Sequence, residues 1–317
     1  KTMNMKKTCW GRIVLSCCPS MIVGCFLLAS CDAKMNENND LAAENLRGPV
    51  SSVKVTSYVD VSEDDSGRPE WKDHEVEHQY FYSPEGMLLR DTRGTQLTHV
   101  HTYDADGRRQ KSESINHWED DLVVREDVYT YDTDGLKVKK ESVLWGNPSE
   151  RWTYTYDAQK RIVREEMYDY DKDACTEVVF HFYDDESPLA EPGEWDRITV
   201  CCYRDGKLVQ KSEQQDGETP VIEDFTYAGG RLKKSVVQTD RSYSETAYGK
   251  SGETLASESK YALDESRFRH NEFVFKYRYD DKGNWIECLC KNTYYDDGLS
   301  KRKSLIKKVR EIVYYGD

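Results

Sequence analysis

The sequence predicts an all-β protein: a long antiparallel meander of about nine hairpins in a twisted or coiled sheet, with little helix. Three observations lead to this fold class. A short aromatic motif recurs along the chain about every 25 residues. Within each copy aromatic side chains alternate with others, which is the period of a β-strand. Each clear copy then continues into Asp and Gly, residues that favour tight turns.

Residues 1–30 have the layout of a signal peptide. Lys6 and Lys7 give a positive start, and a mostly apolar stretch follows that is densest at Met21–Leu28. Pro19 interrupts this stretch, which is too short to span a bilayer comfortably. We therefore expect an export signal rather than a transmembrane helix.

The signal peptide ends in "LLASC", Leu27–Cys31, which resembles a bacterial lipobox. In lipoproteins with this motif the cysteine is lipidated, the preceding bond is cut and the new N-terminus is acylated. The resemblance implies that Cys31 anchors the protein, since several acyl chains bind a membrane durably. It also implies the cell envelope, at the outer membrane, facing either the periplasm or the cell surface. A secreted protein with an incidental cysteine is the alternative.

The rest of the chain divides into a tether and one domain. Residues 31–46 are polar, acidic and free of β-branched side chains, so they are predicted to form a flexible acidic tether. Residues 47–317 are predicted to form the β-hairpin repeat domain. Its first strand is expected just after Gly48, and its last from Ser304.

The repeat reads aromatic–x–aromatic, then Asp, two variable residues and Gly. "YTYDTDGLK" at Tyr129 and "YRYDDKGNW" at Tyr277 are clear copies. Rings two residues apart lie on one face of a strand, and Asp–x–x–Gly suits a type I turn with a glycine bulge. The residues expected to build the motif, in a structural role, are Tyr80, Tyr82, Tyr103, Asp104, Gly107, Tyr129, Tyr131, Asp132, Gly135, Tyr154, Tyr156, Asp157, Tyr203, Tyr227, Tyr277, Tyr279, Asp280 and Gly283.

Individual copies depart from this pattern. Phe182 is expected to take the place of the second tyrosine in the fifth copy, and the shorter turns at Arg204–Lys207 and Ala228–Arg231 suit type I′. Because right-handed twist accumulates over many strands, the sheet is expected to coil with its tyrosine face mostly inside.

At these residues the chain resembles the YD-repeat, or Rhs-like, family, whose repeat runs roughly Y-x-Y-D-x-x-G-R-L. The resemblance covers about Val50 to the C-terminus, and it extends to short YD-repeat lipoproteins of Bacteroides-like bacteria. Large members coil the repeat into a hollow β-shell, which in some encloses a toxin. This chain has fewer and less regular copies, so the resemblance implies a fold more than an activity.

The charge of the chain argues against a nucleic-acid partner. The net charge is −14, and the first 30 residues carry four cations and no acid, which leaves −18 on the remainder. A surface this acidic repels phosphate backbones. The 22 tyrosines and 7 tryptophans argue against disorder.

No catalytic residue, metal site or cofactor is predicted. His99 and His101 share one strand face and could ligate a metal, but no third ligand is marked by spacing. Five cysteines follow Cys31, an odd number, so at least one is expected to stay free or to pair with another chain. Carboxylates are too numerous for any pair to single out a site.

The expected function is a lipid-anchored envelope scaffold that binds a glycan or another envelope protein. Aromatic side chains offer stacking faces to sugars. The expected ligand surface is Trp71, Trp118, Trp145 and Trp152, which lie outside the turn motif. A glycan-active enzyme, which needs a cleft with converging acids, and a toxin-related shell or immunity protein remain alternatives.

Overall fold

The computed structural model describes the chain from residue 40 onward, with short gaps. Signal peptide 1–30, Cys31 and tether residues up to 39 lie outside the described residues. The described ranges are 40–60, 71–72, 76–94, 96–118, 121–184, 195–215, 218–239, 241–262, 268–296 and 300–316.

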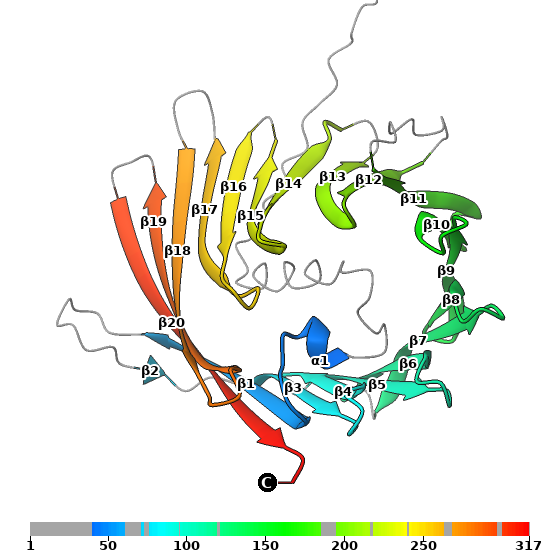
Figure 1. Ribbon diagram of the computed structural model, residues 1–317, viewed down its shortest axis with the longest axis horizontal. Coiled ribbons are helices and arrows are strands. Elements are labelled where there is room, and N and C mark those ends of the chain that lie inside the picture. The colour runs from blue at the N-terminus through cyan, green and yellow to red at the C-terminus, as the bar shows by residue number, and fades with distance from the viewer. Residues whose placement is uncertain are drawn as a thin grey trace, which may run out of the picture.

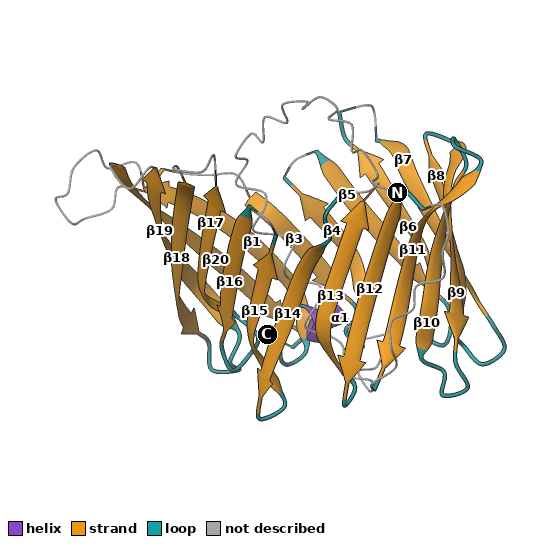
Figure 2. Ribbon diagram, turned by 90° about the horizontal axis from the view of Figure 1, so that it is seen from above, coloured by secondary structure: helices purple, strands orange, loops and turns teal. Residues whose placement is uncertain are grey.

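The described chain is all-β apart from one helical turn, α1 (Asp40–Ala43). The strands are β1 (Val50–Asp60), β2 (Trp71–Lys72), β3 (Val76–Tyr82), β4 (Leu88–Arg93), β5 (Leu97–Tyr103), β6 (Arg109–Asn116), β7 (Leu122–Tyr131), β8 (Lys137–Leu144), β9 (Asn147–Tyr156), β10 (Ile162–Asp169), β11 (Ala174–Tyr183), β12 (Arg197–Arg204), β13 (Lys207–Gln215), β14 (Val221–Ala228), β15 (Arg231–Gln238), β16 (Ser242–Tyr248), β17 (Thr254–Ala262), β18 (Phe268–Tyr279), β19 (Trp285–Asp296) and β20 (Ser300–Tyr314). They run side by side, with the turns gathered at two ends (Figure 2).

The sheet closes into a barrel, so the open, twisted or coiled meander expected from the sequence is wrong. β1 pairs with β3 on one side and with β20, the last strand, on the other. The ring of described strands holds 19, and Figure 1 shows it nearly end on. The short β2 pairs with the last two residues of β1. Closure depends on pairing between strands at opposite ends of the chain, which no local sequence pattern records.

One pair in the ring is parallel, and the odd number of strands requires such a pair. Antiparallel neighbours alternate in direction, so they close a ring by themselves only when the number of strands is even. β11 and β12 are parallel, from Glu177 opposite Arg197 to Tyr183 opposite Tyr203. The fifth copy of the repeat, around Phe182, therefore ends a strand without forming the expected hairpin.

The repeat turns have the geometry expected from their residues. The Asp132 carboxylate accepts the N–H groups of Asp134 and Leu136 at 2.9 Å, and Gly135 has a φ of 80°. The β7–β8 pairing shifts register beside Tyr131, as a glycine bulge requires. Asp104, Asp157 and Asp280 each accept the N–H four residues on, and Gly107 and Gly283 also have positive φ. Both central residues of turns 204–207 and 228–231 have positive φ, as in type I′.

Five tyrosine hydroxyls each tie a hairpin to the one before it. Tyr131 Oη donates to the carbonyl of Arg109 at 2.8 Å, and Arg109 is the first residue of the preceding return strand. The same bond recurs from Tyr103 to Leu88, from Tyr156 to Lys137, from Tyr183 to Ile162 and from Tyr277 to Thr254, at 2.6–2.9 Å. We call these bonds the tyrosine staples.

The motif tyrosines face the inside of the barrel. α1 lies within the ring (Figure 1), and its segment contacts Tyr82 and Tyr103. Because side chains alternate along a strand, the opposite face forms the outer wall. Between β6 and β17 this wall carries ion pairs such as Lys111–Glu126, at 2.6 Å.

Residues 40–47, which we call the strap, are packed against the inner wall. The Asp40 carboxylate accepts hydrogen bonds from Leu88 N, Tyr103 Oη and Arg109 Nη2 at 2.7–3.0 Å. Leu41 and Leu46 are buried in a cluster with Val50, Val53, Val55, Tyr82 and Tyr314, next to the β1–β20 seam. The last residues of the segment expected to be a tether thus belong to the core.

Candidate functional site

The structure separates the four tryptophans that the sequence predicts as a ligand surface. Trp71 lies on the outer wall beside Lys307, whose Nζ is 4.7 Å from its ring centroid. Trp152 faces the lumen, with Lys140 Nζ at 5.4 Å from its ring. Trp118 and Trp145 lie in turns at one end of the barrel and are exposed, by 72% and 49%.

Trp118 and Trp145 begin a row of aromatic side chains along that end. Trp118 lies in the β6–β7 turn, Trp145 in the β8–β9 turn and Tyr170, 36% exposed, in the β10–β11 turn. Successive turns at one end are two strand spacings apart, about 10 Å. We call this row the aromatic rim. It lies at the opposite end from the Asp–x–x–Gly turns, because these two sets of turns alternate along the chain.

Polar and aliphatic groups surround the rings of the aromatic rim. Leu122 and Leu144 are exposed beside Trp118 and Trp145. Asp121 is exposed in the first turn, and Asp171 in the third. Apolar faces together with acceptor oxygens are the groups that bind the C–H faces and hydroxyls of a polyol.

Trp145 is held in a backbone conformation that disfavours it. Its φ is 52° and that of Gly146 is 78°, so the two form a turn in which both residues have positive φ. Asn or Asp normally occupies the first position, because a bulky side chain there is strained. Strain of this kind concentrates at functional positions. The turn therefore places an indole where fold stability alone would place Asn.

Sequence reasoning missed Tyr170, although a signal was present. Trp118, Trp145 and Tyr170 are 27 and 25 residues apart, close to the period of the repeat itself. Reading the repeat for its connecting turns, as well as for its Tyr-Asp motif, would have found all three.

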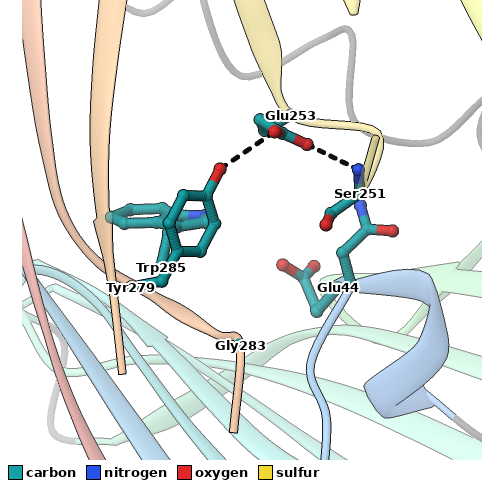
Figure 3. A pocket seen from close by; sticks show the side chains of 7 residues that line it. Glu44, Ser251, Glu253, Tyr279, Gly283 and Trp285 are labelled. Carbon is teal, nitrogen blue, oxygen red and sulfur yellow. Dashed lines mark hydrogen bonds between the residues drawn. The ribbon is translucent and has the colours of Figure 1, made fainter. Parts of the chain in front are cut away.

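A small pocket lies at the other end of the barrel, between the strap and two repeat turns (Figure 3). It is lined by Glu44, Asn45, Ser251, Glu253, Tyr279, Gly283 and Trp285. The Glu253 carboxylate accepts Tyr279 Oη at 2.9 Å and Ser251 N at 2.8 Å. Asn284 holds the strap in place, because its side-chain amide bonds both the N–H and the carbonyl of Arg47.

Glu44 in this pocket has a perturbed pKa. Burial raises the pKa of its carboxyl above the usual range, and the nearby charge of Arg310 only partly offsets this. Arg310 Nη2 lies 3.9 Å from Glu44 Oε2, and its guanidinium stacks 3.7 Å from the ring centroid of Trp285. The pocket thus holds one carboxyl with a raised pKa, Glu44, beside a second carboxyl, Glu253.

The histidines singled out in the sequence form cross-strand hydrogen bonds, and three of the cysteines are buried. His99 and His101 bond Ser114 and Ser112 across the β5–β6 pair, at 2.8 Å each. No cluster of three metal-ligating side chains occurs in the described ranges. Cys175, Cys202, Cys288 and Cys290 are free thiols, and burial raises the pKa of Cys290 to about 12. Buried thiols of this kind are unreactive.

No helix in the described part of the chain is long and apolar enough to cross a membrane.

Comparisons with known proteins assign no family. No protein-family model matches the chain, and no curated protein does. Among solved structures, a porin-like protein from Bacteroides uniformis has a TM-score of 0.39 and 11% identity, covering 84% of this chain and 98% of its own. A chain of a TcdB2–TccC3–Cdc42 structure has a TM-score of 0.39 and 12% identity, covering 77% of this chain but 14% of its own.

A Photorhabdus luminescens Tc holotoxin pore has a TM-score of 0.28 and 12% identity, covering 73% of this chain and 15% of its own. The chain thus spans a small part of both toxin chains. At these TM-scores the likeness assigns neither family nor function. The resemblance to the YD-repeat family stays a prediction from the sequence.

Proposed function

We propose that the protein is an envelope-located barrel that binds a linear glycan along the aromatic rim. The observation that carries this proposal is the row of Trp118, Trp145 and Tyr170, one exposed ring per hairpin turn. A step of about 10 Å between rings suits an extended sugar chain, since each ring stacks on a sugar along its length. The strained backbone of Trp145 supports a role in binding over a role in folding.

Binding of purified full chain to a panel of soluble polysaccharides, measured by affinity electrophoresis and calorimetry, tests the proposal. Trp118→Ala and Trp145→Asn are each expected to weaken binding about tenfold, which corresponds to about 1.4 kcal/mol. Tyr261→Ala is the control, because Tyr261 is 44% exposed, close to the 49% of Trp145, but lies in β17, several strands beyond the rim turns. Equal binding by all variants, or none by the wild type, would rule out the rim.

The lipid anchor expected at Cys31 belongs to the same proposal. It rests on the lipobox-like "LLASC" of the sequence. Labelled palmitate should enter the wild-type chain and leave Cys31→Ala unlabelled, and that variant should move from the membrane to the soluble fraction. If the wild-type chain takes up no label, the lipid anchor is excluded and the glycan proposal is unaffected.

Glycan hydrolysis is a second candidate function, favoured by the pocket of Figure 3. Glu44, with its raised pKa, shares this pocket with Glu253 and two aromatic rings. Most glycosidases hydrolyse the glycosidic bond with a pair of carboxyl groups, one of which has a raised pKa. Reducing ends released from a bound polysaccharide should then disappear in Glu44→Gln while rim binding persists. If no polysaccharide that binds yields product, hydrolysis is excluded and binding remains the proposed function.

A further inference from the structure

The outer wall of β18, β19, β20 and β1 differs from the rest of the barrel in its charge. Lys276, Lys291 and Lys303 are exposed on three adjacent strands, and none forms an ion pair with any residue that the structure describes. Several lysines elsewhere on the described outer wall are paired: Lys139 lies 2.9 Å from Glu141, and Lys234 lies 2.7 Å from Glu245. Unpaired positive charge is thus concentrated here on a chain of net charge −14.

Apolar groups alternate with these cations. The cross-strand register places Leu289 between Lys276 and Lys307, and Lys291 between Val274 and Leu305. Lys307 itself lies against two rings, 4.8 Å from that of Tyr58 and 4.7 Å from that of Trp71. Lysines interleaved with aliphatic side chains and flanked by Tyr and Trp are the composition of a surface that rests at a membrane interface.

We propose that this basic wall, Lys276, Lys291, Lys303 and Lys307 with Tyr58 and Trp71, docks the barrel sideways onto an anionic lipid surface. Charge complementarity favours that occupant, because unpaired lysines gain attraction only from a negatively charged partner. The acidic remainder of the protein is repelled by the same surface, so attraction and repulsion select one orientation. Lipid headgroups contact the wall, and the barrel stays outside the hydrocarbon.

The contact is independent of the glycan proposal and of the acyl anchor. The rim turns lie at the end of the barrel, whereas the basic wall lies along its side, so both surfaces can be occupied at once. An acyl chain would hold the protein near the membrane without orienting it. The basic wall supplies the orientation.

Sedimentation with vesicles tests the proposal, using full chain carrying Cys31→Ser so that no acyl chain contributes. Binding is expected to vesicles containing phosphatidylglycerol and not to pure phosphatidylcholine, and it should fall steeply between low and high salt. The triple variant Lys276→Gln, Lys291→Gln, Lys303→Gln should weaken binding about 100-fold at low salt, since each lysine near an anionic surface contributes about fivefold.

A second triple variant with the same change in net charge is the control. Lys111→Gln, Lys139→Gln, Lys234→Gln removes three outer-wall lysines that are paired with carboxylates. It is expected to weaken vesicle binding by no more than about threefold. Equal losses of vesicle binding in both triple variants would overturn the proposal. So would a wild-type protein that does not bind anionic vesicles, or one that binds a soluble polyanion in preference to them.

Discussion

Trp145 shows a single residue serving binding at the expense of folding. It occupies a position of positive φ that Asn accepts with less strain. Trp145→Asn is therefore expected to raise the free energy of unfolding by about 0.5–1 kcal/mol while it weakens glycan binding. Urea denaturation followed by tyrosine fluorescence measures the first effect. A destabilised variant would mean that the indole supports the fold.

Each tyrosine staple depends on a single hydroxyl group. Tyr131→Phe removes only the hydroxyl that donates to the Arg109 carbonyl, so we expect a loss of about 1 kcal/mol in unfolding free energy. Tyr129→Phe is the control, because no hydrogen bond from that hydroxyl occurs in the described part of the chain. Similar losses in both variants would show that the staple bond contributes little.

At the residue scale the sequence predicts the hydrogen bonds within turns well, but it predicts contacts between distant residues poorly. The Asp and Gly side of the motif acts within five residues, so Asp132 and Gly135 take the positions their chemistry implies. The staple joins residues about 20 apart and depends on register. Aligning the fifth copy on Phe182 missed Tyr183, which donates the staple bond to Ile162; the Tyr183–Asp184 dipeptide was the available signal.

The turn that contains Asp104 carries a pH dependence that follows from this aspartate. Hydrogen bonds from the Arg108 backbone and side chain hold the pKa of Asp104 below its ordinary value of 3.8. A carboxyl whose pKa is lowered by folding stabilises the fold fully above its unfolded pKa, and this contribution is lost as pH falls through the lowered value.

Unfolding midpoints in urea are therefore expected to be flat near neutral pH and to fall below about pH 4. Asp104→Asn, which keeps an acceptor oxygen but cannot ionise, should be less stable at pH 7 and should lose less on acidification. A midpoint that rises on acidification would contradict this assignment.

Hairpins are the part of the fold that the sequence predicts best. The first and last strands, the two-residue turns and the bulged turns lie where the period-two pattern and the Gly positions place them. β11 is the exception, because it pairs in parallel with β12 where the sequence suggested another hairpin. A run of alternating residues specifies a strand but is silent on the direction of its neighbour.

Closure of the sheet into a barrel is a property of the whole molecule, and the sequence did not predict it. The seam joins Val53 to Ile312 and Val55 to Arg310, from opposite ends of the chain. The strap covers this seam from inside with Leu41 and Leu46. These two leucines lie in a short polar segment, where two apolar residues are too few to predict burial.

The strap predicts a stability effect out of proportion to its length. Asp40→Ala removes the acceptor of the Leu88 N–H. It also removes one partner each from Tyr103 Oη, which keeps the Leu88 carbonyl, and from Arg109 Nη2, which keeps Tyr103 Oη. We therefore expect a loss of about 1–3 kcal/mol. Asp134→Ala removes an exposed carboxylate 3.3 Å from Lys160 and should cost under about 0.5 kcal/mol. Chemical denaturation of the two variants compares them; equal costs would show that the strap is not part of the cooperative fold.

The parallel pair limits how the number of strands in the ring can change. One Tyr-Asp repeat contributes an outgoing and a returning strand, so inserting or deleting a whole repeat leaves the parity of the ring intact. The seam between β1 and β20 would still meet in opposite directions. One added lone strand would instead either remove the parallel pair, if it lay between β11 and β12, or create a second parallel pair elsewhere. Each repeat therefore adds the same length to the circumference of the barrel, and the width of the lumen can change in steps of one hairpin.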